Sequence, residues 1–418
     1  MRVLWFGILF FAAAPGLAVA QAPPTPLAPL VAEAQRNNPG IRAAELAWRA
    51  ARLAVAPAGA LPDPQAMVQQ VTIGSPAPFA GADTSAFAYT GIAISQQLPY
   101  PGKLKLRAAV AQGEAAVLRE NWRQARRRLA RQVEAAYDEL AYTRAELAVL
   151  GRERVVLAAA AKFAGLRYRD GDGPQAAVLS AQLEQTQLLS DRAGLDRQWA
   201  AGQAELRALL NRPAAAAPVT PLPLRQTRLR ASAAQLNADL SRSDLPLAAQ
   251  QARIAAAGVG VSLARKNFRP DFSAQYMYQR MGQGMGNAYQ WTLGMTLPWF
   301  HRASRYQPEL ERAVEQQDQA RAAYGELVQQ QRLQLADALL RVQNDAQILL
   351  LDRQGLLPQA AAAMTSSLTA YGAGQEDFQS FLDAWRRNLA LERQYWSTLA
   401  DHEIALSRVA ELAGVPHD

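Results

Sequence analysis

An internal duplication constrains this chain more than any other feature of its sequence. The pair Leu98-Pro99 recurs as Leu297-Pro298, 199 positions later, and the run Leu209–Pro213 recurs as Leu412–Pro416, 203 positions later. Periods of this length lie far above the roughly 20 to 50 residues of solenoid repeats. Each copy is therefore expected to be one structural unit. The expected divisions are a first repeat over 21–213, a connector of mixed structure over 214–245 and a second repeat over 246–418.

Each copy contains an unusually long helical pattern. The first is expected to begin at Pro101, because proline is favoured at the first helical position, and to run over 101–167. At 1.5 Å per residue this helix would be a rod of about 100 Å. The second is expected over 305–370, where apolar residues recur at intervals of seven: Val328, Leu335, Val342, Leu349 and Leu356. Sustained heptads predict packing between long helices, and a simple antiparallel coiled coil would show the same periodicity.

A glycine-containing turn follows each long helix. The first copy has Asp170-Gly171-Asp172-Gly173-Pro174, and the second has Gly372-Ala373-Gly374. Glycine supplies the positive φ that ends a helix, and proline is well placed to start the next one. The chain is therefore expected to reverse at both turns and to return through helices over 175–210 and 378–412.

Four segments alternate between apolar and polar residues, as strands with one apolar face do. They cover 65–73 and 87–98 in the first copy, and 271–281 and 288–297 in the second. Each is about ten residues long, which is the length of a tilted strand that crosses a bilayer. The clearest of them places these residues on one face: Tyr289, Trp291, Leu293, Met295 and Leu297.

These strands fit two environments. In an outer-membrane barrel the apolar face meets lipid, and Tyr100, Trp299 and Phe300 lie where a strand leaves the bilayer. In a soluble protein the two hairpins would pack on helices with their aromatic faces inside. In lipid every backbone group needs a partner, so a sheet must close on itself. Four strands are fewer than the eight of the smallest barrels, so the membrane interpretation requires an oligomer.

The N-terminal residues 1–20 are interpreted as a secretory signal peptide. Arg2 precedes an apolar run over 3–14, and Ala18-Val19-Ala20 resembles a cleavage site. The alternative is a short membrane anchor, but the run is shorter than the roughly 18 to 20 apolar residues of a spanning helix. The sequence has no cysteine, which excludes disulfides and thiolate chemistry. Its net charge of +8 comes mainly from scattered arginines, so no nucleic acid is expected as a partner.

No arrangement of catalytic residues is recognisable. Neither a nucleophile elbow nor a phosphate-binding loop is present, and the three histidines lie in no metal-ligand spacing: His301, His402 and His417. Four methionines near the third and fourth strands offer soft ligands for copper, although methionine more often fills space: Met277, Met281, Met285 and Met295. No enzymatic activity, cofactor or resident metal is expected.

Several passages together resemble the TolC family of outer-membrane channels. They are Leu98-Pro99-Tyr100-Pro101-Gly102-Lys103, Arg269-Pro270-Asp271-Phe272, Leu297-Pro298-Trp299-Phe300, and Ala370-Tyr371-Gly372-Ala373-Gly374 followed by Asp377-Phe378. The resemblance covers essentially the whole chain after residue 20 and fits its duplication. The nearest likeness is to outer-membrane components of heavy-metal efflux systems of the resistance-nodulation-division type.

The resemblance implies a mainly helical homotrimer. Each protomer would give four strands to a twelve-stranded β-barrel in the outer membrane and its helices to a tunnel through the periplasm. The two turns would form the tip that meets a periplasmic adaptor and an inner-membrane pump. Family members often narrow this tip with acidic residues, and the matching candidates lie near Tyr371: Asp170, Asp172, Glu376 and Asp377. An acidic ring would favour cations, whereas helix capping is an alternative role for Asp377.

The expected function is therefore the passive exit duct of a tripartite efflux system, for metal cations or small toxic compounds. Its expected membrane-interface aromatics are Tyr100, Tyr289, Trp291, Trp299 and Phe300. Two alternatives are the outer-membrane duct of a type I secretion system and a soluble periplasmic adaptor. An adaptor would carry a single helical hairpin between small β-domains.

Overall fold

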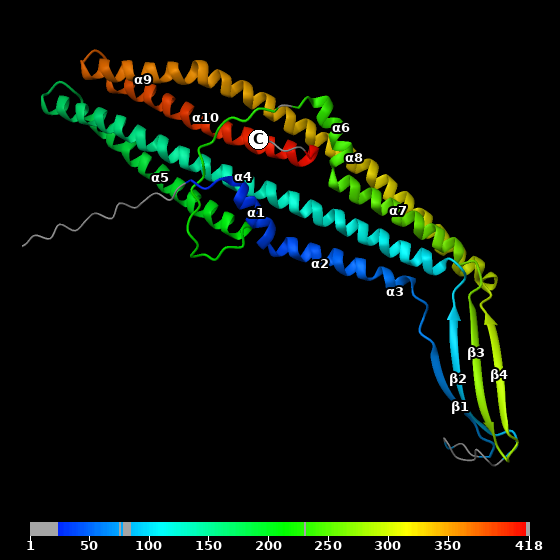
Figure 1. The fold of residues 1–418 in the computed structure, drawn as a ribbon. Coiled ribbons are helices and arrows are strands. Elements are labelled where there is room, and N and C mark those ends of the chain that lie inside the picture. The colour runs from blue at the N-terminus through cyan, green and yellow to red at the C-terminus, as the bar shows by residue number, and fades with distance from the viewer. Residues whose placement is uncertain (1–23, 75–76, 78–84, 230, 415–418) are drawn as a thin grey trace, which may run out of the picture.

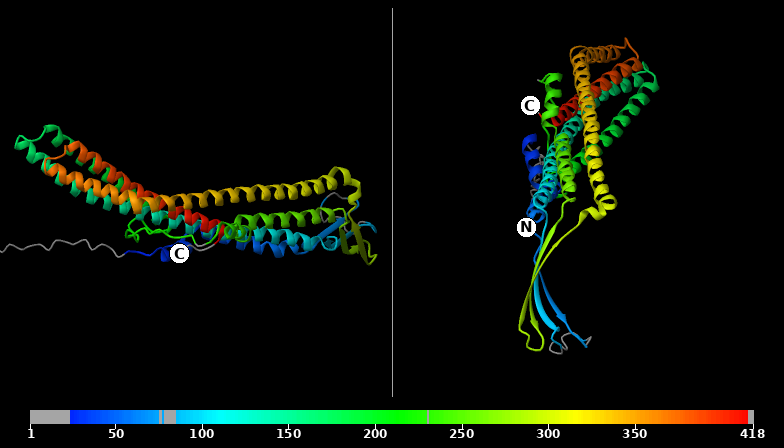
Figure 2. Two further views of the ribbon diagram at one scale, coloured as in Figure 1. Left: turned by 90° about the horizontal axis from the view of Figure 1, so that it is seen from above. Right: turned by 90° about the vertical axis from the view of Figure 1, so that its right-hand side faces the viewer.

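The protein consists of an elongated helical bundle with a sheet projecting from one end, as seen in a computed structural model (Figure 1). The structure describes residues 24–74, 77, 85–229 and 231–414. The expected signal peptide over 1–20 and His417 lie outside these residues. The two helical turns lie at the end of the bundle opposite the sheet (Figures 1 and 2).

Both repeats have the same order of elements. The first comprises α1 (Leu27–Asn37), α2 (Pro39–Leu53), α3 (Val55–Gly59), β1 (Gln65–Val71), β2 (Tyr89–Leu98), α4 (Lys103–Arg169) and α5 (Gln175–Leu209). The second comprises α6 (Ala233–Ser243), α7 (Leu245–Lys266), β3 (Phe272–Met281), β4 (Asn287–Met295), the short turns η1 (Pro298–His301) and η2 (Arg302–Tyr306), α8 (Gln307–Leu351), η3 (Asp352–Leu356), α9 (Leu357–Gly372) and α10 (Phe378–Ala413).

The first long helix, α4, is unbroken over its 67 residues. It begins at Lys103 rather than at Pro101, because Gly102 has a φ of +90° and ends a turn just before the helix. At 1.5 Å per residue α4 is about 100 Å long. It packs on α2, α5, α7 and α10 and is the central element of the bundle.

The second long helix is not continuous over 305–370 as expected. The π-helical turns η2 and η3 precede α8 and separate it from α9. Pro308 and Pro358 each follow such a turn by two residues. Proline cannot donate the i→i−4 hydrogen bond and its ring clashes with the carbonyl that would accept it, so one extra residue is accommodated in the preceding turn.

The sheet has the order β1-β2-β3-β4 with all neighbours antiparallel. The strands are slightly shorter or shifted relative to the sequence-based ranges: the first ends at Val71, the second begins at Tyr89, and the fourth ends at Met295. β2 and β3 join the two repeats, because Tyr89 pairs with Met281 and Leu98 pairs with Phe272.

The hydrophobic core runs along the helices rather than forming one globule. In the part of the chain that the structure describes, four clusters of buried residues line the bundle, and the largest joins α4, α5, α9 and α10 near the turns. The α4–α7 contact is close, since a Cβ placed on Gly113 would lie 2.5 Å from the Cβ of Ala256. No helix among the described residues is long and apolar enough to span a membrane.

Candidate functional site: the two-faced sheet and the helical tip

The two faces of the sheet differ in polarity over much of their area. The strand register aligns Val68, Ile92, Tyr278 and Tyr289 across one face. The next row on that face contains Ala66, Ile94, Tyr276 and Trp291. The opposite face carries a row of Gln65, Ser95, Gln275 and Thr292. The register thus combines the alternation of the separate strands into one mainly apolar face and one mainly polar face. The polar face also carries an apolar row of Met67, Ala93 and Met277.

The apolar face is open to its surroundings. Ile92 is 58% exposed, Trp291 73% and Leu293 82%. The rings on this face contact one another, with centroids 4.8 Å apart for Tyr276 and Trp291. A large, contiguous, exposed apolar surface indicates contact with lipid or another protein.

The two edges of the sheet are also open. β1 pairs only with β2, and β4 pairs only with β3, among the described residues. An unpaired edge presents free N–H and C=O groups, which favour pairing with another strand. The protomer therefore offers two strand edges and one apolar face at the same end.

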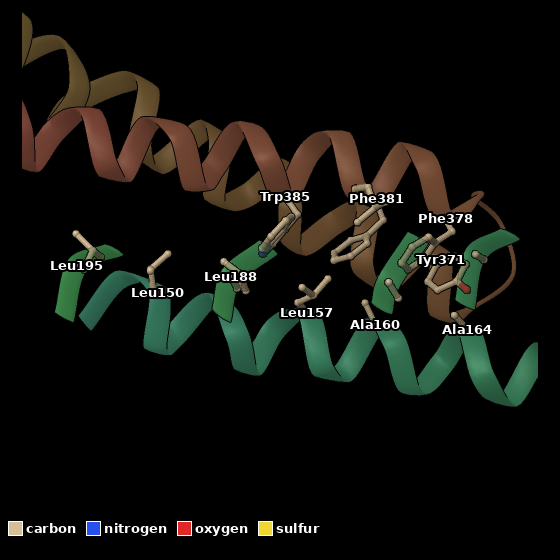
Figure 3. Packing of buried hydrophobic residues seen from close by; sticks show 13 residues of the cluster. Leu150, Leu157, Ala160, Ala164, Leu188, Leu195, Tyr371, Phe378, Phe381 and Trp385 are labelled. Carbon is tan, nitrogen blue, oxygen red and sulfur yellow. The ribbon is translucent and has the colours of Figure 1, made fainter. Parts of the chain in front are cut away.

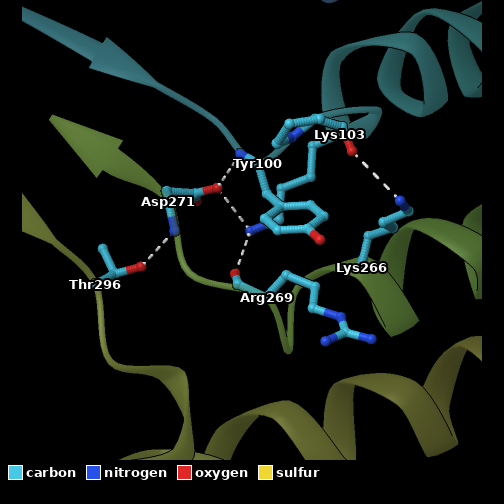
Figure 4. Close-up of polar contacts among 7 residues, drawn as sticks. Tyr100, Lys103, Lys266, Arg269, Asp271 and Thr296 are labelled. Carbon is cyan, nitrogen blue, oxygen red and sulfur yellow. Dashed lines mark hydrogen bonds and ion pairs between the residues drawn. The ribbon is translucent and has the colours of Figure 1, made fainter.

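The strands are anchored to the helices by one carboxylate. Asp271, which precedes β3, accepts a hydrogen bond from the backbone N–H of Tyr100 at 2.7 Å and pairs with Lys103 Nζ at 2.8 Å (Figure 4). Lys103 Nζ also donates to the carbonyl of Arg269 at 3.0 Å. The backbone N–H of Asp271 donates to the hydroxyl of Thr296 at 2.8 Å. These contacts hold the starts of α4 and β3 and the end of β4 together.

This anchor was not predicted from the sequence, in which Lys103 and Asp271 appear only as parts of motifs. The available signal was Lys103 at the start of a helix, one of four lysines in a chain rich in arginine, but the 168-residue separation of the pair concealed the contact.

The expected interface aromatics lie partly within the sheet and partly at the junction of the sheet with the helices. Tyr289 and Trp291 belong to the apolar face of β4. Trp299 and Phe300 follow β4 in η1, 55% and 73% exposed, and their ring centroids are 6.5 Å apart. Tyr100 lies between β2 and α4 in the anchor described above (Figure 4).

The two turns at the far end of the bundle have the same hydrogen-bond pattern. Gly171 N donates to Tyr168 O at 3.3 Å and Asp172 N to Arg167 O at 2.9 Å. In the second repeat Gly374 N donates to Tyr371 O at 3.0 Å and Gln375 N to Ala370 O at 2.9 Å, at positions 203 later. Both are Schellman motifs, in which glycine at positive φ closes the helix; φ is +82° at Gly171 and +77° at Gly374.

The tip core is built from aromatics of one repeat and alanines of the other. Tyr371, Phe378, Phe381 and Trp385 are buried and lie against α4 (Figure 3). The residues opposite them are small: Ala160, Ala164, Ala177 and Ala181. Tyr371 is 3% exposed, and its ring centroid is 5.2 Å from that of Phe378. Burial raises the pKa of Tyr371, although nearby Arg167 acts in the opposite direction.

Arg167 connects the two turns. Its guanidinium lies over the ring of Tyr371, 5.4 Å from the centroid, and donates to the carbonyl of Asp172 at 3.1 Å. A longer hydrogen bond of 3.5 Å reaches the carbonyl of Tyr371. Tyr371 and Asp172 were predicted as tip residues from the sequence, but Arg167 was not, because a single arginine in a long helix belongs to no motif.

The four candidate carboxylates of the tip are exposed: Asp170, Asp172, Glu376 and Asp377. Asp377 caps α10, since its side chain accepts from Ser380 N at 2.7 Å. This bond holds the pKa of Asp377 below its usual value. Glu376 accepts a short hydrogen bond from the Ser367 hydroxyl. Tyr371 is a core residue rather than an exposed member of this group.

The methionines and histidines do not converge. Met277 and Met281 lie on the polar face of the sheet, Met295 lies on the apolar face opposite Phe272, and Met285 is in the hairpin loop. Met277 is buried and accepts from Gln279 Nε2 at 3.2 Å. His402 is buried beside Glu403, with 3.0 Å between Nδ1 and Oε1, whereas His301 is exposed near the sheet. The described residues contain no group of three or more His, Cys, Asp and Glu side chains able to hold a metal ion.

Comparison with known proteins adds the decisive observation. No protein-family model and no curated protein matches the sequence. Several solved structures match the fold, including the following three. A membrane protein from Pseudomonas aeruginosa is 22% identical, with 93% of each chain covered and a TM-score of 0.81. The outer-membrane protein VceC of Vibrio cholerae is 18% identical, with 94% of this chain and 97% of VceC covered and a TM-score of 0.78. The outer-membrane channel MtrE of Neisseria gonorrhoeae is 18% identical, with 93% of this chain and 89% of MtrE covered and a TM-score of 0.77.

The chain has the fold of an outer-membrane channel. The resemblance to the TolC family is confirmed at the level of this fold. The match extends over nearly the whole of each chain, so it includes both the sheet and the helical bundle. Two of these solved neighbours are described as an outer-membrane protein and an outer-membrane channel, and the likeness to them concerns the fold.

Proposed function

We propose that the chain is one protomer of an outer-membrane channel, the passive exit duct of a tripartite efflux system. The observation that carries the proposal is the two-faced sheet. Its apolar face is exposed from Ile92 to Leu293, while the other face carries glutamine, serine and threonine beside the buried Ala93 and Met277. Lipid on one side and water on the other would satisfy both faces, as in an outer-membrane barrel.

Assembly of several copies follows from the open edges. A four-stranded sheet in lipid must close, and three copies joined from β4 to β1 would give the twelve strands that the resemblance to the TolC family implies. The exposed leucines of α8 support such packing, because Leu333 is 71% exposed and Leu340 66%. We therefore propose a homotrimer, with the barrel in the outer membrane and the helices forming a tunnel in the periplasm.

The helical tip is the proposed contact with a periplasmic adaptor and an inner-membrane pump. Three of its exposed carboxylates, Asp170, Asp172 and Glu376, would narrow the tunnel and favour cations over anions. The cargo of such a duct is selected by the pump, and metal cations or small toxic compounds are the proposed classes. Asp377 contributes less to selectivity in this proposal, since its charge already caps α10.

Single-channel recording tests the proposal. Purified protein in a planar bilayer is expected to conduct ions with a preference for cations, and Asp170→Asn/Asp172→Asn/Glu376→Gln is expected to reduce that preference. A matched control, Asp196→Asn/Glu315→Gln/Asp318→Asn, removes three exposed carboxylates from the helical shaft and should leave selectivity unchanged. Recovery of the protein as a monomer in water without detergent would overturn the channel itself, and equal selectivity of all variants would overturn only the role of the tip.

A further inference from the structure

The junction between the sheet and the helices carries an excess of positive charge. Five exposed basic residues lie within about two helical turns of the strand ends; we call them the basic collar: Lys105, Arg107, Arg265, Arg269 and Arg302. The ion pairs at this level among the described residues are Lys103–Asp271 and Arg305–Glu309, and neither engages the collar. Asp63, before β1, is the one other acidic residue on the described segments that join strands to helices, and Glu309 and Glu311 lie in the first two turns of α8.

Three aromatic rings at the junction between the sheet and the helices each contact a cationic side chain. Lys266 Nζ is 5.2 Å from the ring centroid of Tyr100. Arg302 Cζ is 5.8 Å from that of Phe268. Arg305 Cζ is 5.4 Å from the ring of its neighbour Tyr306. Mixed aromatic and cationic side chains are favoured at a membrane surface, where rings meet the acyl boundary and cations meet phosphate.

We propose that the basic collar binds the headgroups of anionic phospholipids in the leaflet nearest the helices. The inference rests on the proposed function, which places the apolar face of the sheet in lipid. That face ends at the collar, in the row of Leu98, Phe272 and Met295, each of them at least 40% exposed. Asp271 directly precedes Phe272, but its charge is paired with Lys103. The exposed charged groups that follow are the guanidinium and ammonium groups of the collar, which match phosphate in charge and hydrogen-bonding geometry.

The order of residues after β4 favours a collar that faces lipid over one that faces the pore. Trp299 and Phe300 continue from the strand whose apolar face is most exposed, and Arg302 follows two residues later. Its guanidinium rests on the Phe268 ring, which keeps the charge beside aromatic surface. If the collar faced the pore instead, it would act on passing ions and not on lipid.

Lipid retention by the full-length protein tests the collar. Wild-type protein is placed in vesicles of phosphatidylethanolamine and phosphatidylglycerol, extracted in mild detergent, and its retained lipids are counted by mass spectrometry. Enrichment of phosphatidylglycerol over its share in the vesicle is expected, with a decrease as salt rises. The variant Arg265→Gln/Arg269→Gln/Arg302→Gln is expected to lower the enrichment by roughly 10- to 100-fold, since each basic residue at an anionic surface strengthens binding several-fold.

The matched control removes the same charge far from the sheet. Arg154→Gln/Arg197→Gln/Arg332→Gln changes three exposed arginines of α4, α5 and α8, and it should retain phosphatidylglycerol as wild type does. Equal retention by both variants, or a salt-independent wild-type result, would overturn the proposal. A shift in ion selectivity with unchanged retention would assign the collar to the pore and also overturn it. A protein that never enters vesicles would contradict the proposed function, whereas one that inserts and conducts without lipid enrichment would contradict this inference alone.

Discussion

The two long helices are copies of one another, yet only one is enclosed. Buried positions of α4 recur in α8, each 202 positions later: Leu129, Val133, Ala136, Tyr137 and Leu140 correspond to Gln331, Leu335, Ala338, Leu339 and Val342. α4 is surrounded by α2, α5, α7 and α10, whereas α8 packs mainly on α7 and α10. The duplication therefore accounts for the buried face that both helices share. It does not determine which elements cover their other sides.

The difference between α4 and α8 is clearest at positions next to the buried face that they share. Asp138 of α4 is largely enclosed, with Glu134 and Glu403 nearby. Its counterpart in α8 is Leu340, which is 66% exposed. A second pair shows the same inversion, since Arg131 is paired with Glu411 while its counterpart Leu333 is 71% exposed. The enclosed helix thus carries charge toward neighbours of the same chain, and the open helix carries leucine outward, as a helix does at a surface that another subunit covers.

The largest expected effect is on the enclosed side of α4 near the tip. Trp385 of α10 is 1% exposed and belongs to the cluster containing Leu150 and Leu157 of α4. Trp385→Ala is expected to lower the free energy of unfolding by about 3–5 kcal/mol, because it leaves a cavity among residues that cannot collapse. Urea unfolding followed by circular dichroism measures this, with the exposed Trp299→Ala as control. Equal effects of the two variants would mean that enclosure of α4 does not stabilise the tip.

A smaller effect is expected from Asp138, and it depends on pH. Burial raises the pKa of Asp138 to about 8, with further contributions from Glu403 and Glu134. The unfolded value is about 3.9, so between about pH 4 and 8 the unfolded chain releases a proton that the folded protein retains. Stability therefore falls as pH rises through this window.

Asp138→Asn removes this dependence at the enclosed position. The variant should be more stable than wild type at pH 8, on the order of a few kcal/mol after allowance for partial exposure, and the difference should vanish near pH 4. Melting temperatures across this range measure it, with the exposed Asp196→Asn as control. A variant that is less stable than wild type at pH 8 would contradict the assignment.

A larger side chain on the enclosed side of α4 tests how closely the two repeats pack at the tip. Ala160 is fully buried against the aromatics of α10, while Ala159 beside it is exposed. Ala160→Leu is expected to destabilise the protein by about 1–3 kcal/mol, because the extra methyl groups displace packed rings. Ala159→Leu should change stability by about 0.5 kcal/mol or less. Indistinguishable unfolding curves for the two variants would show that α4 has unused space at the tip.

The sequence predicted these elements where a pattern repeats along the chain. Heptads, glycine turns and alternation located the long helices, the two tip turns and the four strands to within a few residues. The π turns before Pro308 and Pro358 were not predicted, because a single proline signals a disturbance but not its geometry. The anchor between Lys103 and Asp271 and the contact of Arg167 with Tyr371 were missed for another reason: each joins segments far apart in sequence. Only the packing of one repeat on the other brings them together.

The smallest expected effect on protomer stability is on the open side of α8, and it bears most directly on the comparison. Leu340→Gln replaces an exposed leucine, so folding and helicity should change by about 0.5 kcal/mol or less. The fully buried Leu335 of the same helix is the contrast, and Leu335→Gln is expected to destabilise the protomer by about 2–3 kcal/mol because it places an amide in the core. If a second subunit covers α8, Leu340→Gln should instead dissociate the oligomer at dilutions where wild type stays assembled, as measured by light scattering on size-exclusion chromatography. An oligomer as tight as wild type would mean that α8 meets its partner elsewhere, and that the leucines of its open side serve no interface.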